Sequence, residues 1–224
     1  MDMSRWITYK AKDGIIDTYL DYEEGLPAFQ NFIRKGLKIA VQYVAMECTD
    51  KLNEYRFLDT FFSDTINDVL FEEILKEAQQ LECNIKVLLS DPFSSYAQIR
   101  ASSINQCKEA ELSKGLKHIL DALKRVFSIK PVENIEHMEL KNLMNYVQDE
   151  GETHNINIRF YSDCPSGPMY FLRNLLLCGR FNAGKTAALL PWTMIVKDPS
   201  VKGDIYDIQL DEFEYLWESS TKAR

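Results

Sequence analysis

Residues 64–92 read DTINDVLFEEILKEAQQLECNIKVLLSDP, an amphipathic segment that runs directly into an apolar one. The amphipathic part has its apolar residues at helical spacing, and Asp64 stands where a helix N-cap is expected. Residues 84–92 are an apolar run closed by Ser-Asp-Pro, which is typical of a buried parallel strand. A helix that is long enough to cross a sheet and leads into such a strand predicts a parallel α/β unit.

The segment before this unit extends its pattern. Apolar residues recur at helical spacing between Leu26 and Ile33, and Gly36 is expected to end that helix as a C-cap glycine. Residues 37–46, LKIAVQYVAM, are rich in β-branched and aromatic side chains and predict a strand. The resulting order of helix, strand, helix and strand again indicates a parallel α/β arrangement.

The segments after the unit alternate in the same way. They predict helices over 94–127 and 138–147, a strand over 155–165, a hairpin made of 169–181 and 185–196 that turns at Asn182, Ala183 and Gly184, and a last helix over 204–220. The last helix is expected to turn Ile208, Phe213, Leu216 and Trp217 inward, with Asp211, Glu212 and Glu214 on its solvated face.

These elements predict an α/β fold with a mixed, largely parallel central sheet flanked by helices, followed by a C-terminal β-hairpin and a final helix. No linker, repeat or low-complexity segment interrupts the chain. We therefore expect residues 1–224 to form a single domain, with residues 1–29 as an N-terminal extension or helix.

Composition excludes several classes of protein. The net charge of −8 argues against a dedicated nucleic-acid binder, which needs clustered Lys and Arg. No apolar run is long enough to span a membrane, and residues 1–14 lack the hydrophobic core of a signal peptide, so we expect a cytoplasmic protein. The 5 Cys include no C-x-x-C pair, which favours reduced thiols, and Cys83, Cys107 and Cys178 have the surroundings of small core residues.

The stretch CGRFNAGKT, residues 178–186, has the spacing of a phosphate-binding loop, with Gly184, Lys185 and Thr186 at its end. Such a loop must open a long helix, whereas Pro191 would end a helix here almost as soon as it began. The residues after Thr186 are also too few for the remaining units of a nucleotide-hydrolase fold. We interpret the stretch as a turn and keep nucleotide binding through these three residues as an alternative.

Three pieces resemble one family together: EEILKEAQQLECNIKVLLSDP (72–92), INIRFYSDCPSGPMYFLRNLLLCGRF (156–181) and YDIQLDEFEYLWESS (206–220). In this order and spacing they resemble a phospholipase D-like domain of bacterial cytosolic proteins, over roughly residues 30–219. The resemblance implies that the α/β fold is one half of a phospholipase D-like arrangement. It also implies association of two copies as a homodimer, since the active fold pairs two such halves around one site.

Active members of that family carry His-x-Lys, four residues and then Asp, the groups that attack and orient the phosphate. None of the chain's 3 His has Lys two positions later: His118, His137 and His154 are followed there by Leu120, Glu139 and Ile156. The resemblance therefore implies a degenerate site, and we expect no catalytic residue, no metal and no cofactor.

Polar residues near predicted strand ends are the remaining candidates, because open α/β sheets place ligands there. Asp91 can cap the following turn or contact a ligand, and Arg100 can be a surface residue or a ligand contact. Arg159 alternates with apolar residues in a strand, so it must pair, for example with Asp91, or bind an anion. Further residues expected at the same rim are Tyr161, Tyr170 and Arg173.

These observations favour a non-catalytic sensor or interaction module that binds a small anionic ligand or a protein partner in the cytosol. A phosphodiester- or nucleotide-processing enzyme with an unrecognised site is the first alternative, and the nucleotide binder described above is the second.

Overall fold

The computed structural model describes residues 15–19, 25–42, 54–63, 65–103, 107–130, 135–181, 191–197 and 202–220. Its seven strands form one sheet in the order β1-β7-β6-β5-β2-β3-β4. The strands are β1 (Ile15–Tyr19), β2 (Glu54–Leu58), β3 (Asn84–Ser90), β4 (Ile156–Tyr161), β5 (Met169–Leu172), β6 (Leu175–Cys178) and β7 (Trp192–Val196). The helices are α1 (Gly25–Gln42), α2 (Asp68–Gln80), α3 (Ser95–Ser103), α4 (Lys108–Phe127), the short 3₁₀ helix η4 (Ile135–His137), α5 (Leu140–Thr153) and α6 (Ile205–Ser219).

The sheet is mixed. Strands β2, β3 and β4 are parallel neighbours, whereas β5 pairs with β2 antiparallel, and β6, β7 and β1 continue in antiparallel order. This confirms the predicted mixed α/β fold with a hairpin and a final helix. The parallel part is narrower than "largely parallel" implies, because it consists of three of the seven strands.

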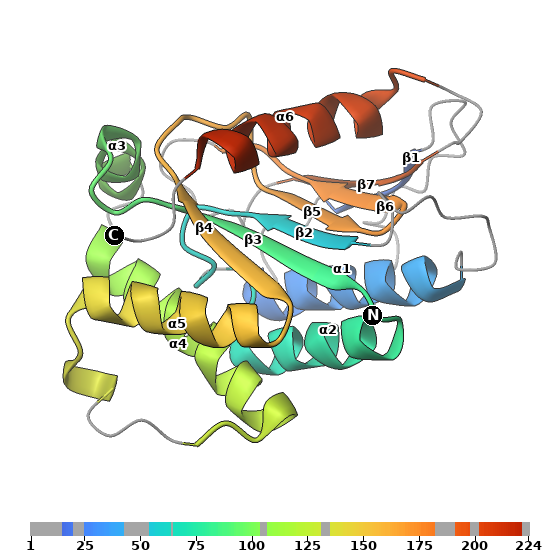
Figure 1. Cartoon of the computed structure of the whole chain (residues 1–224). Helices are drawn as coiled ribbons and strands as arrows, with labels where there is room; N and C mark the ends of the chain where they lie inside the picture. Colours follow the sequence, from blue (N-terminus) through green and yellow to red (C-terminus); the bar gives the residue numbers. More distant parts are fainter. Residues whose placement is uncertain are drawn as a thin grey trace.

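Helices cover both faces of the sheet (Figure 1). Helices α1, α2, α4 and α5 lie on one face, over the larger hydrophobic cluster, and α6 lies on the other face over a smaller one. Helix α3 stands at the edge where β3 ends, on the left of Figure 1. In the part of the chain that the structure describes, no helix combines the length and the apolar character needed to cross a bilayer.

The predicted end of the first helix at Gly36, with a strand after it, is wrong. Helix α1 continues through Gly36 to Gln42, so residues 37–42 are helical and not the start of a strand. A Cβ at position 36 would lie 3.2 Å from Leu177 Cδ1 and 3.3 Å from Leu175 Cδ2. The glycine therefore allows α1 to approach β6 closely and does not end the helix. The strand that precedes α2 is β2, and the residues 43–46 of the expected strand lie outside the described residues.

The first segment of the predicted hairpin is two strands and not one. Residues 169–181 contain a complete hairpin, β5 and β6, which turns at Arg173 and Asn174. Arg173 adopts the left-handed conformation, with φ of 60°. Strands β6 and β7 are antiparallel neighbours as expected, but the proposed turn residues 182–184 lie outside the described residues.

Other predicted details differ at single residues. The N-cap of α2 is Asn67, whose side chain accepts from Leu70 N at 2.8 Å, and Asp64 lies outside the described residues. Ile208 was expected inside but is 58% exposed, while Phe213, Leu216 and Trp217 are buried. Cys83 is buried and Cys178 half-buried, whereas Cys107 is exposed and not a core residue.

Candidate functional site

The carboxyl ends of β2, β3 and β4 meet at one edge of the sheet, beside α3. A polar residue follows each strand: Asp59, Asp91 and Ser162. Backbone hydrogen bonds hold these ends in register, from Asp59 N to Leu88 O (3.0 Å), from Ser90 N to Thr60 O (2.9 Å) and from Asp91 N to Tyr161 O (2.8 Å). We call this region the carboxyl edge.

Asp59 lies at the centre of the carboxyl edge and is only 4% exposed. Its Oδ1 accepts from Thr60 N at 2.6 Å, and its Oδ2 accepts from Thr65 Oγ1 at 2.6 Å and from the Tyr170 hydroxyl. Burial raises the pKa of Asp59, while these three donors and the charge of Arg100 act in the opposite direction. The acceptor atoms of this carboxylate are therefore used inside the protein.

Arg100 brings a positive charge to the same edge. It stands in the last turn of α3 and is 6% exposed, and its guanidinium carbon lies 4.9 Å from the centre of the Phe181 ring. Its charge acts on Asp59 and on Tyr96. A buried guanidinium needs compensating charge or polar partners, and Asp59 supplies part of that compensation.

Three hydroxyl groups are buried nearby, those of Thr60, Ser90 and Tyr96. The hydroxyls of Thr60, Tyr96 and Tyr161 interact with one another, whereas Ser90 Oγ has no hydrogen-bond partner among the described residues. The Tyr96 ring lies 6.0 Å from that of Tyr161, and burial raises the pKa of Tyr96 to about 12. The Tyr96 phenol is therefore a neutral group that can donate a hydrogen bond at physiological pH.

The remaining polar groups of this edge are committed to the protein. Asp91 Oδ1 accepts from Phe93 N at 2.9 Å, and its Oδ2 accepts from Ser162 Oγ at 3.4 Å. Asp91 thus organises the turn into α3, the structural role that its sequence position allowed. Tyr161 is buried and donates through its hydroxyl to Asp59 O at 3.0 Å.

Arg159 does not join this group. It lies on β4, where it donates from Nη1 to Trp217 O at 3.0 Å and covers the Trp217 ring with its guanidinium carbon 4.4 Å from the centroid. Both Asp91 and Arg159 belong to the described residues, and no ion pair joins them. The considered pairing of these two residues is therefore wrong.

Arg173 lies at the opposite edge of the sheet, because the β5–β6 turn stands beside the amino end of β2. It is buried there, its carbonyl accepts from the Tyr206 hydroxyl, and its charge lowers the otherwise raised pKa of Glu77. Of the five predicted ligand residues, the structure brings together Asp91, Arg100 and Tyr161 and separates Arg159 and Arg173 from them. Gly184, Lys185 and Thr186 lie outside the described residues.

Sequence reasoning missed the central residues of the carboxyl edge. Asp59, Thr60 and Thr65 follow a strand that was not predicted, and Ser90 and Tyr96 were not considered. Tyr170, expected at a rim, is fully buried against Asp59. The signal that could have found Asp59 is FLDT, residues 57–60, an apolar run closed by polar residues like the one that ends at Asp91.

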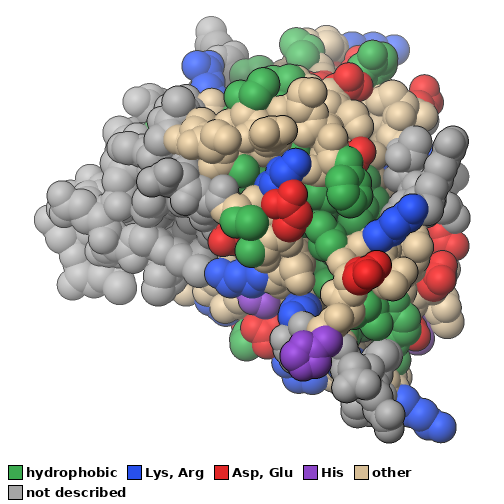
Figure 2. Space-filling model, turned by 90° about the vertical axis from the view of Figure 1, so that its left-hand side faces the viewer, with side chains coloured by type: hydrophobic (Ala, Val, Ile, Leu, Met, Phe, Trp, Pro, Cys, Tyr) green, Lys and Arg blue, Asp and Glu red, His purple; other side chains and the backbone are tan. Residues whose placement is uncertain are grey.

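Figure 2 faces the carboxyl edge. Hydrophobic side chains and charges of both signs are interspersed on it, without a wide patch of Lys and Arg among the coloured residues. No group of three or more His, Cys, Asp or Glu in the described part of the chain could hold a metal ion. The three His lie elsewhere. In α4, His118 Nδ1 is 3.3 Å from the carbonyl oxygen of Ile66, His137 is exposed in η4, and His154 stacks on Phe127.

Comparisons with solved structures give distant likenesses, of which two are described. Nuc from Salmonella typhimurium, a phospholipase D family member, is 12% identical with a TM-score of 0.40, over 84% of this chain and 90% of that one. TrmBL2, an archaeal chromatin protein with a novel mode of DNA binding, is 12% identical with a TM-score of 0.39, over 88% of this chain and 63% of that one. No protein-family model and no curated protein matches the chain.

Proposed function

We propose that the chain is a cytosolic binding domain of the phospholipase D-like type without hydrolytic activity, and that it holds a small anion at the carboxyl edge. The observation that carries this proposal is the presence of buried Arg100 at the same edge of the sheet as the buried hydroxyls of Thr60, Ser90 and Tyr96. Hydroxyls in such a position need a hydrogen-bond partner, because an unsatisfied buried polar group destabilises the fold.

The balance of donors and acceptors at this edge favours an anion. The carboxylates of Asp59 and Asp91 already accept hydrogen bonds from the protein's own groups. The hydroxyls of Ser90 and Tyr96 can donate, and Arg100 supplies a planar cation that matches carboxylate and phosphate groups. A ligand that only accepts hydrogen bonds and carries negative charge fits this set.

The size of the ligand follows from the surface around it. An extended polyanion needs a continuous field of Lys and Arg, but the charges seen in Figure 2 alternate in sign and the chain carries a net charge of −8. A single phosphate, sulfate or carboxylate group requires one cation and a few donors. A small anionic ligand is therefore the better occupant.

Calorimetric titration with inorganic phosphate and sulfate tests this function. Tyr96→Phe removes one hydroxyl with little change in packing and should weaken anion binding about tenfold or more, the loss of one hydrogen bond to a charged group. Arg100→Gln removes the cation and should abolish binding. Tyr215→Phe, on the 65% exposed Tyr215 of α6, is the matched control and should bind like the wild type. Absence of anion binding, or equal binding by Arg100→Gln, would refute the proposal.

A further inference from the structure

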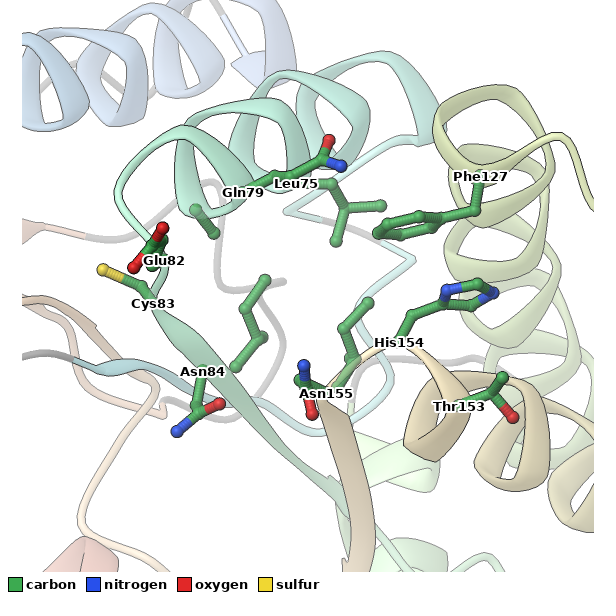
Figure 3. A pocket seen from close by; sticks show the side chains of 12 residues that line it. Leu75, Gln79, Glu82, Cys83, Asn84, Phe127, Thr153, His154 and Asn155 are labelled. Atoms are coloured by element: carbon green, nitrogen blue, oxygen red, sulfur yellow. The ribbon is translucent and has the colours of Figure 1, made fainter.

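A cavity lies at the edge of the sheet opposite the carboxyl edge, where β3 and β4 begin (Figure 3). Its volume is about 480 Å³, within the usual range of small-molecule pockets. Its walls come from the last turns of α2, α4 and α5 and from the first residues of β3 and β4. Buried aliphatic side chains form its floor: Leu75, Ala78, Ile85 and Ile156.

Three helices end at this cavity. Helices α2 and α5 each lead into a parallel strand, so each ends where that strand begins, and α4 ends beside them. Gln79 near the end of α2, Phe127 at the end of α4 and Thr153 at the end of α5 all line the cavity. A helix C-terminus carries partial negative charge from its free carbonyl groups. The three helix ends at this cavity therefore all contribute negative electrostatic potential.

At these helix ends, the described residues offer little free positive charge to offset the negative potential. Neither α2 nor α5 has a basic residue in its last turn. The basic residues in the last turn of α4 are engaged by acids: Lys124 lies 3.2 Å from Asp121, and Arg125 lies 2.7 Å from Asp68 and 2.6 Å from Glu72. The residues that line the cavity include no Lys or Arg, and Glu82 adds a carboxylate.

An aromatic pair forms the wall opposite Glu82 and Cys83 in Figure 3. The rings of Phe127 and His154 stack with their centroids 4.0 Å apart and an interplanar angle of 11°. The face of an aromatic ring attracts a cation, and the stack holds the Phe127 ring in a fixed orientation. The amide side chains of Gln79, Asn84 and Asn155 lie at the border of the same cavity.

We infer that this cavity binds a small organic cation, an ammonium group that carries an apolar substituent. The helix ends and Glu82 attract the charge, and the aliphatic floor with Phe127 takes the substituent. A bare metal ion is the poorer occupant, because the described residues hold no group of three His, Cys, Asp or Glu. This site is independent of the anion site, since the two lie at opposite edges of the sheet.

Titration with three compounds of one shape tests the inference. Benzylammonium should bind, benzyl alcohol should bind about tenfold more weakly because it lacks the charge, and benzoate should not bind. Glu82→Gln and Phe127→Leu should each weaken benzylammonium binding about fivefold. Glu218→Gln and Phe93→Leu make the same changes at exposed positions outside the cavity and should bind like the wild type.

The outcomes separate clearly. Preference for the charged amine, reduced in Glu82→Gln while the thermal unfolding midpoint is kept, supports the site even where Phe127→Leu folds poorly. Equal binding of benzyl alcohol, preference for benzoate, or no binding of any of the three compounds overturns it. Phosphate binding measured on the same protein remains a separate result, so failure here does not bear on the anion site.

Discussion

Arg159 and Trp217 form the contact that joins β4 to the end of α6. Arg159 Nη1 donates to the carbonyl of Trp217 at 3.0 Å, and the guanidinium carbon lies 4.4 Å from the centre of its indole ring. Lys86 on the neighbouring strand lies 5.3 Å from the same ring. A cation at the C-terminal end of a helix also interacts favourably with the helix dipole. The charge of Arg159 therefore has a structural use on the face of the sheet that α6 covers.

We predict that Arg159→Met lowers the free energy of unfolding by about 1 kcal/mol, from the lost hydrogen bond and cation–π contact of a half-buried side chain. Phosphate binding at the carboxyl edge should not change, because Arg159 is not part of it. Urea unfolding and calorimetry on the same variant measure the two quantities. Lys130→Met, at an exposed residue, is the control for loss of one positive charge. A variant that unfolds like the wild type but loses phosphate binding would contradict this assignment.

Glu212 and Glu214 are not simply the solvated face of α6, as their pattern suggested. Glu212 accepts from Ser166 N and from Ser166 Oγ, both at 2.7 Å, and so ties the β4–β5 loop to the helix. Glu214 lies 3.0 Å from Arg56 Nε and 3.8 Å from Lys86 Nζ. Asp211 is exposed, as expected.

Glu212→Gln should therefore loosen the β4–β5 loop. The amide lacks the negative charge that strengthens both Ser166 hydrogen bonds, and this loss costs about 1 kcal/mol. We expect faster hydrogen exchange at Ser166 N and unchanged exchange in β3. Asp211→Asn is the matched control on the same helix, and equal exchange rates in the two variants would contradict the contact.

Gly36 and Gly115, which both lie within helices, differ in the space that a Cβ atom would have. A Cβ on Gly115 would lie 1.9 Å from the backbone oxygen of Phe61, which cannot move without shifting the chain. A Cβ on Gly36 would meet only flexible Leu side chains, the nearest at 3.2 Å. Gly115→Ala should therefore destabilise the protein by about 2 kcal/mol or more, despite the gain of about 1 kcal/mol in helix propensity.

Gly36→Ala should change the stability by less than about 1 kcal/mol, because the propensity gain and the tighter contact oppose each other. Thermal and urea unfolding of the two variants side by side measure this difference. Equal stability losses would mean that α4 does not approach residue 61 as closely as the structure has it.

Local periodicity predicts those helices and strands whose pattern of apolar residues lies within one element. The α2 segment has apolar residues every three or four positions up to Ala78, and β3 follows as a plain apolar run. β4 alternates, and α6 has an N-cap at Asp204 that accepts from Asp207 N at 2.9 Å. These features are contained in the sequence within one element, so they could be predicted.

The errors arose where a residue's role depends on a distant contact. Gly36 resembles a helix end until its contact with Leu177 is known. Arg173 and Asn174 turn a hairpin without the Asn-Gly signal, so two short strands look like one. The carboxyl edge joins Asp59 to Tyr170, which are 111 residues apart in the sequence. No local pattern reports such a pairing, and only the positions after strand ends point toward it.

Asp59 should stabilise the fold more at low pH than at high pH, the reverse of a carboxylate whose pKa is lowered on folding. Burial raises its pKa above the value of about 4 of an unfolded chain, so the folded protein holds the proton more tightly than the unfolded one. The stabilisation from this proton is complete below about pH 4 and is lost as the pH rises through the pKa of the folded state. Asp59→Asn cannot titrate, so the free energy of unfolding of the wild type minus that of the variant should fall as the pH rises. Urea unfolding of both proteins over a pH series measures this difference, with Asp211→Asn as an exposed control. A difference that grows with pH would mean that Arg100 and the three hydrogen-bond donors outweigh burial and lower the pKa of Asp59.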